Sequence, residues 1–107
     1  MDIPTPTPRR PPQPRGLRCF IVEDSVVIRQ NLIATLEEML EVETVGTAED
    51  EQGAVDWLRG SAPDACELVI IDIFLKSGTG LEVLRQAREL MPDTALAVLT
   101  NRGETLH

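Results

Sequence analysis

The sequence predicts a doubly wound α/β fold, in which helices cover both faces of a parallel sheet. Four short apolar segments with strand character alternate with three segments of helical periodicity. One of them, residues 68–71, has four large aliphatic side chains in a row and therefore requires burial on both faces. The length of 107 residues fits one domain of this kind.

The first predicted strand covers residues 19–22 and ends at the acidic pair Glu23 and Asp24. Ser25 follows the pair and can cap a helix, because its hydroxyl accepts a hydrogen bond from a backbone N–H of the first turn. Apolar residues then recur at helical spacing through residues 28–40. We therefore expect a helix directly after the acidic pair.

The second predicted strand covers residues 42–48, and its mixed composition favours an edge position in the sheet. The acidic residues 49–51 suit the first turn of a helix, where they face the positive end of the helix dipole. Gly60 and Pro63 then predict the end of this second helix.

The third predicted strand ends at Asp72, and a third helix follows it. Thr79 and Glu82 have the spacing of a capping box, in which each side chain bonds the backbone of the other residue. Apolar residues at helical spacing continue to Met91, and Pro92 predicts the end of the helix.

The fourth predicted strand covers residues 95–99 and is followed by Thr100. Short right-handed crossovers between the strands give the order 2-1-3-4 of flavodoxin-like sheets. In this order ligands bind at the carboxyl ends of strands one and three, so Glu23, Asp24 and Asp72 are expected in one crevice.

Three carboxylates in one crevice repel one another, and the repulsion raises the pKa of at least one of them. A bound cation relieves this repulsion, and ligands that are all oxygen favour Mg²⁺. Thr100 offers a hydroxyl group at the same rim. The sequence therefore predicts a magnesium site formed by Glu23, Asp24 and Asp72.

Residues 1–16 hold six of the eight prolines, so we expect a disordered arm there and a domain over residues 17–107. This domain carries 7 basic and 17 acidic side chains, a charge that disfavours direct binding of nucleic acid. No apolar run is long enough to span a membrane and the start does not resemble a signal peptide, so the expected location is cytoplasmic. Cys19 and Cys66 are expected to be buried, unpaired thiols.

The domain resembles the receiver domain of bacterial two-component response regulators, over residues 18–100. The resemblance is carried by the pair Glu23 and Asp24, by residues 72–81, and by Thr100. Asp72 follows Asp24 by 48 residues and precedes Thr100 by 28, intervals that are similar to those of the family.

The resemblance implies that Asp72 accepts a phosphoryl group from a phosphohistidine of a sensor histidine kinase. It also implies that Asp24, Asp72 and the carbonyl of Phe74 ligate Mg²⁺, that Glu23 acts through a water, and that Thr100 moves toward the phosphoryl group. Its only catalysis would be of its own phosphorylation and dephosphorylation.

The chain departs from the family pattern at two places. Lys76 stands where many receivers have proline. Receivers also carry a lysine after a fifth strand and then a fifth helix, whereas this chain ends at His107. We therefore expect a C-terminally truncated receiver whose fourth strand is an exposed edge, open to self-association.

Three functions compete at this point. The first is a phosphoacceptor module that signals by contact with an unidentified protein partner, and the second is an interaction module that works without phosphorylation. The third is a phosphatase with an aspartyl nucleophile, similar to the haloacid dehalogenases, but such enzymes carry a second Asp where this chain has Phe74. Labelling of Asp72 by a small phosphodonor separates the first two.

Overall fold

The computed structural model of the chain describes residues 16–100. Four parallel strands form one sheet in this part of the chain, in the order β2-β1-β3-β4. The sheet order and the alternation of strands and helices confirm the predicted fold. The elements in chain order are β1 (Leu17–Val22), α1 (Val26–Met39), β2 (Val42–Ala48), α2 (Glu51–Gly60), β3 (Leu68–Asp72), α3 (Gly80–Leu90) and β4 (Ala95–Leu99).

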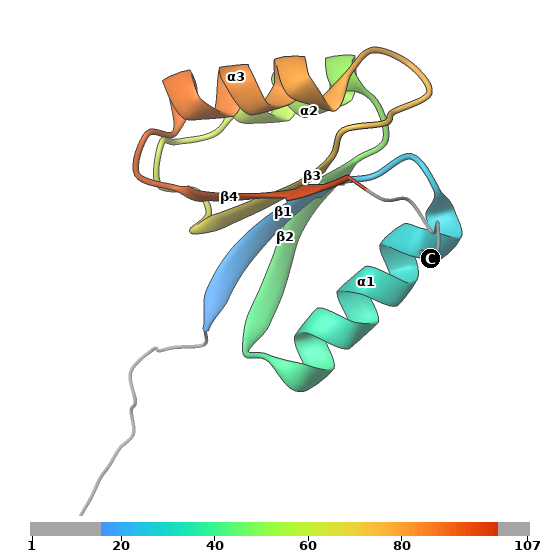
Figure 1. Cartoon of the computed structure of the whole chain (residues 1–107). Coiled ribbons are helices and arrows are strands. Elements are labelled where there is room, and N and C mark those ends of the chain that lie inside the picture. Colours follow the sequence, from blue (N-terminus) through green and yellow to red (C-terminus); the bar gives the residue numbers. More distant parts are fainter. Residues whose placement is uncertain (1–15, 101–107) are drawn as a thin grey trace, which may run out of the picture.

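The larger core lies between the sheet and the helices α2 and α3, which cover the same face (Figure 1). Alternate residues of β1 and β3 point into it and meet the apolar faces of the two helices, as the strand and helix periodicities require. Phe20 of β1 stacks on Trp57 of α2 with ring centroids 3.9 Å apart. A Cβ atom on Gly46 would lie 2.5 Å from Nε1 of Trp57, so only glycine leaves room for the indole there. The buried members of this core are Phe20, Val22, Ala54, Leu58, Cys66, Val69, Ile71, Leu75, Val83, Ala87 and Met91.

The smaller core lies on the opposite face of the sheet, which α1 covers in part (Figure 1). Its buried members, Cys19, Ile21, Val42 and Ile70, come from the strands alone. No residue of α1 is buried, and only Leu32, Ile33 and Leu36 of this helix pack on the smaller core, where they stay half-buried. The two faces therefore hold their helices with different amounts of apolar contact.

Side-chain caps begin all three described helices. The Ser25 hydroxyl accepts a hydrogen bond from the backbone N–H of Ile28 at 3.2 Å, which confirms the predicted cap of α1. Thr79 caps α3 through the N–H of Leu81, but the predicted capping box is wrong. The backbone N–H of Thr79 donates instead to Oε1 of Glu51 in α2 at 2.9 Å, and the carboxylate of Glu82 bonds Arg85 and Gln86. Glu51 of α2 therefore accepts the hydrogen bond that the capping box assigns to Glu82.

Both cysteines are buried free thiols, as predicted. Burial raises the pKa of Cys19 to about 11 and raises that of Cys66 as well, so both thiols stay protonated at neutral pH. Among the described residues, no helix has the length and apolar character that a membrane span requires. The residues that follow Thr100 and the predicted arm lie outside the described part, except for Gly16, which is the last residue of the arm and the first described residue.

Candidate metal and phosphoacceptor site

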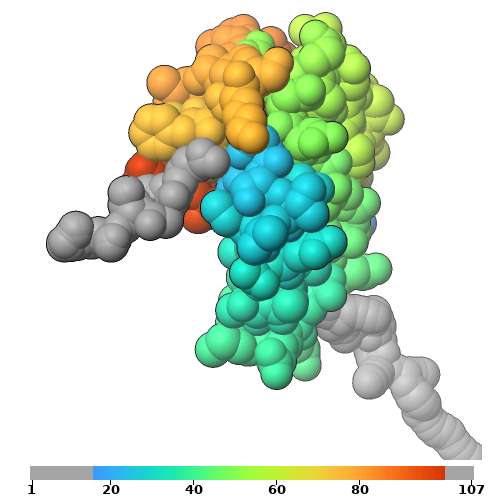
Figure 2. All heavy atoms as spheres, turned by 90° about the vertical axis from the view of Figure 1, so that its right-hand side faces the viewer, coloured from blue at the N-terminus to red at the C-terminus, as the bar shows by residue number. Residues whose placement is uncertain are grey.

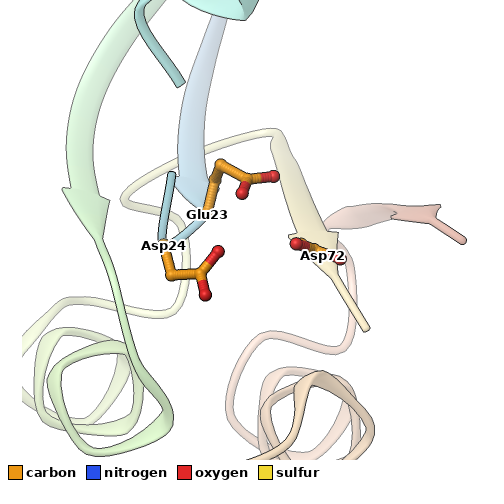
Figure 3. Close-up of side chains that lie close together, drawn as sticks. All are labelled: Glu23, Asp24 and Asp72. Carbon is orange, nitrogen blue, oxygen red and sulfur yellow. The ribbon is translucent and has the colours of Figure 1, made fainter. Parts of the chain in front are cut away.

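The three carboxylates predicted to share one crevice meet at the carboxyl ends of β1 and β3 (Figure 3). β1 and β3 are parallel neighbours, with Val22 paired to Ile71, so the residues that follow Val22 lie beside Asp72. One carboxylate oxygen from each of Glu23, Asp24 and Asp72 lies within 4.8 Å of the others. The sheet order thus brings together residues that are 48 positions apart in the chain.

The three carboxylates differ in burial, so the cluster has a buried side and a partly exposed side. Asp72 is fully buried and Glu23 is 1% exposed, whereas Asp24 is half-buried and forms the partly exposed side. Burial raises the pKa of the Glu23 carboxyl, and repulsion from Asp72 and Asp24 adds to this effect. The predicted conflict between the carboxylates therefore exists in the folded protein.

Backbone N–H groups orient all three carboxylates. The N–H of Ser25 donates to Oε2 of Glu23 at 3.0 Å. From the loop that joins β3 to α3, the N–H of Phe74 donates to Oδ1 of Asp72 at 2.9 Å and the N–H of Lys76 donates to Oδ2 of Asp24 at 2.9 Å. One loop therefore contacts two of the three acidic residues.

The donor set fits a divalent cation that prefers oxygen ligands. All three side chains offer carboxylate oxygens, which suit Mg²⁺, and the half-buried Asp24 leaves one side of the group accessible to water or substrate. A cation among them would offset the repulsion that, together with burial, raises the pKa of Glu23. The group could therefore hold a metal ion.

The structure places the other two predicted site residues at the same edge of the sheet. Thr100 directly follows β4, whose last residue, Leu99, pairs with Asp72, and its side chain is exposed. Phe74 comes two residues after Asp72 and is 54% exposed. The hydroxyl and carbonyl groups of these two residues are thus on elements that border the carboxylates.

Sequence reasoning missed two groups that act on the β3–α3 loop beside the site, the backbone N–H of Lys76, which bonds Asp24, and the side chain of Glu51, which bonds Thr79. The N–H of Lys76 was missed because a residue type in a loop does not show in which direction its backbone N–H points. For Glu51 the sequence indicates only an interaction with the helix dipole, because its bond to Thr79 spans 28 positions and leaves no local pattern. The available signal in the sequence was the glycine at position 78, a residue type that permits a tight turn, and in the structure its φ is 83°.

The fold is a doubly wound α/β domain, and its carboxylate cluster lies at the carboxyl ends of two neighbouring strands, where α/β domains of this kind bind their ligands. The family model of the response regulator receiver domain matches residues 19–106. The chain therefore belongs to the receiver domain family of two-component response regulators.

Relatives and solved structures are consistent with this assignment. The chain is 35% identical over 91 residues to protein-glutamate methylesterase/protein-glutamine glutaminase 5 of Anaeromyxobacter dehalogenans, covering 83% of this chain and 24% of the relative. The structure of NtrX from Brucella abortus in complex with ATP is similar with a TM-score of 0.68 and 26% identity, over 82% of this chain and 19% of that chain. A response regulator from Burkholderia pseudomallei with a phosphorylated aspartic acid and a calcium ion has a TM-score of 0.62 and 21% identity, over 76% and 45% of the two chains. The chain thus spans about a quarter of the length of the methylesterase relative.

Proposed function

We propose that the chain is the phosphoacceptor module of a two-component phosphorelay, in which Asp72 accepts a phosphoryl group from a sensor histidine kinase. The observation that carries this proposal is the fully buried Asp72 carboxylate with two further carboxylates within 4.8 Å. A nucleophile whose acidic neighbours can hold a cation suits phosphoryl transfer, because this reaction depends on positioning and on the neutralisation of phosphoryl charge. The phosphorylated aspartic acid and the calcium ion of the Burkholderia pseudomallei response regulator support the same chemistry.

In the proposed reaction, an Asp72 carboxylate oxygen forms a bond to phosphorus and the N–P bond of the phosphohistidine breaks. The electron pair of that bond stays on the imidazole nitrogen, which takes up a proton from water. Asp24, Asp72 and the Phe74 carbonyl would hold Mg²⁺, with Glu23 acting through a water, and the bound ion would neutralise charge on the phosphoryl oxygens. The hydroxyl of Thr100 would donate a hydrogen bond to the transferred phosphoryl group and so change the position of the end of β4.

Labelling with acetyl phosphate and Mg²⁺, followed by intact-mass measurement at neutral pH, tests the proposal. The parent chain is expected to gain one phosphoryl group and Asp72→Asn to gain none, because the amide is not a nucleophile of this kind. Thr100→Ala is the matched control and keeps the label, since its hydroxyl acts only after transfer. Label in Asp72→Asn would point to another acceptor.

An interaction module that works without phosphorylation is the second candidate. Four apolar side chains are exposed in segments that begin next to the site, namely Val26, Val27, Phe74 and Leu81. Such side chains favour contact with a protein partner whether or not Asp72 is modified. A folded parent chain that takes no label would favour this candidate over the phosphoacceptor.

A further inference from the structure

We propose that Glu51 is a positioning residue that fixes the β3–α3 loop and, through this loop, the Asp24 carboxylate, thereby raising the affinity of the site for Mg²⁺. This inference rests on the proposed function of the carboxylate cluster. Glu51 is the first residue of α2 and lies outside the cluster. Its effect is therefore exerted through the loop and not by ligation.

Glu51 bonds the loop with both its backbone and its side chain. Its backbone N–H donates to the carbonyl oxygen of Ser77 at 3.2 Å, and its Oε1 accepts from the N–H of Thr79 at 2.9 Å. The first N–H groups of a helix have no partner within the helix, so this donor is available for a contact with another segment. Two bonds to residues two positions apart fix both the place and the direction of the loop.

Gly78 lies between the two bonded residues and lets the loop approach α2 closely. Its φ of 83° is in the left-handed region, and a Cβ atom there would lie 2.3 Å from Cβ of Glu51 and 2.5 Å from Oε1. No side chain fits at this position without a shift of the backbone or of Glu51. We call Glu51, Ser77, Gly78 and Thr79 the loop clamp.

The loop clamp continues directly into the site. Ser77 is the next residue after Lys76, whose N–H donates to Oδ2 of Asp24 at 2.9 Å. Figure 2 views the molecule from the side on which the strands end, and it shows the segment after β1, the β3–α3 loop and the start of α2 side by side. A loop held at Ser77 and Thr79 therefore presents the Lys76 N–H in one position, and this N–H orients the half-buried Asp24.

Two explanations of an effect of Glu51 on Mg²⁺ affinity, positioning through the loop clamp and direct attraction of the cation by the Glu51 charge, lead to different predictions. Glu51→Gln keeps an oxygen that accepts from Thr79 N–H but removes the negative charge, whereas Glu51→Ala removes both. Positioning predicts that the alanine variant loses affinity and that the glutamine variant retains it. Attraction of the cation by the charge predicts that both variants lose affinity alike.

The experiment is a titration of the full ¹⁵N-labelled chain with Mg²⁺ alone, followed by nuclear magnetic resonance. We expect the dissociation constant to rise about five-fold in Glu51→Ala, the effect of one lost hydrogen bond, and to stay near the parent value in Glu51→Gln. Gly78→Ala is expected to behave like Glu51→Ala, because its methyl group displaces the clamp. Glu49→Ala removes an exposed charge near the start of α2 and is the matched control, with no expected change. The amide spectrum without Mg²⁺ shows whether each variant is folded.

A second readout separates positioning from a general loss of structure. Labelling by acetyl phosphate in Glu51→Ala should need more Mg²⁺ for half its maximal rate, while the rate at saturating Mg²⁺ stays close to that of the parent. Equal Mg²⁺ affinity in the parent and Glu51→Ala, or equal losses in the alanine and glutamine variants, would overturn the clamp and leave the proposed function intact. A folded parent that shows no saturable response to Mg²⁺ would overturn both.

Discussion

At the scale of single residues, the main feature of the site is that three negatively charged side chains of unequal burial lie close together. Asp72 and Glu23 are buried and Asp24 is half-buried, and the raised pKa of Glu23 reflects burial and repulsion, which both disfavour its charged form. The free energy of unfolding is lowered by this repulsion until something neutralises it. The cluster is therefore expected to link stability to the cation.

We predict that Mg²⁺ stabilises the protein through Asp24. At a Mg²⁺ concentration ten times the dissociation constant, the gain is about 1.4 kcal/mol, enough to raise the melting temperature by about 5 °C or more. Asp24→Asn should melt at a higher temperature than the parent in EDTA, because one repelling charge is gone, and should gain little from Mg²⁺. Thermal melts with and without Mg²⁺ test this, with Asp93→Asn at the amino end of β4 as the control. An equal gain in Asp24→Asn and the parent would contradict the site.

We also predict a pH-dependent contribution from the pair of Arg18 and Glu67 at the amino ends of β1 and β3. The hydrogen bonds from Arg18 lower the pKa of the Glu67 carboxyl below its ordinary value. A carboxyl whose pKa is lower in the folded state contributes stability above its unfolded pKa of about 4.3, and this contribution is lost as the pH falls through the folded value. Because both side chains are partly exposed, the effect is small. Glu67→Gln should unfold at slightly less urea than the parent at pH 7, and the difference should shrink as the pH falls below about 4.3.

At the scale of elements, the strands and helices were predictable from their apolar patterns, and each helix also begins at a capping side chain. Ser25 and the limits of β2 and β4 agree with the expectation from sequence. The capping box at Thr79 failed because the competing acceptor, Glu51, belongs to another helix, and no local pattern shows which distant group comes near. The loop clamp could not be predicted for the same reason, since its bonds join residues from distant segments. The carboxylate cluster was predictable because the strand order alone brings its residues together.

The two faces of the sheet predict unequal effects of the same substitution in α1 and α2. Leu58 of α2 is 1% exposed in the larger core, whereas Leu32 of α1 is half-buried against the smaller core. Leu58→Ala should lower the free energy of unfolding by about 2–5 kcal/mol, since it leaves a cavity in a packed core. Leu32→Ala should lower it clearly less. Urea unfolding of both variants decides, and equal losses would show that α1 is held as firmly as α2.

At the scale of the whole molecule, the sheet is covered unevenly. α2 and α3 cover one face, and α1 lies near β2 on the other (Figure 1). Within residues 16–100, β4 has a neighbouring strand only on its β3 side. Its residues are all apolar, and Ala95 and Ala97 are exposed. Such a strand can pair with a strand of another chain.

We predict that the 107-residue chain associates through β4 as its concentration rises. Ala97→Lys places a charge on the exposed side of the strand and should reduce association without unfolding the protein, because charged side chains oppose edge pairing. Light scattering over a range of concentrations measures the effect, with the exposed Glu38→Lys in α1 as the control for added positive charge. A parent chain that stays monomeric throughout would contradict this prediction.

The stacked rings of Phe20 and Trp57 give the protein a built-in optical reporter. The chain has one tryptophan and no tyrosine, so its near-ultraviolet emission comes from a single indole. That indole lies at 7° to the ring of Phe20 and against Gly46, and loss of this packing exposes it to water and moves the emission to longer wavelength. Phe20 lies in β1, and Glu23 directly follows the last residue of this strand, three positions after Phe20. The wavelength of the emission maximum therefore reports, without any added dye, on the packing of the strand that leads into the carboxylate cluster.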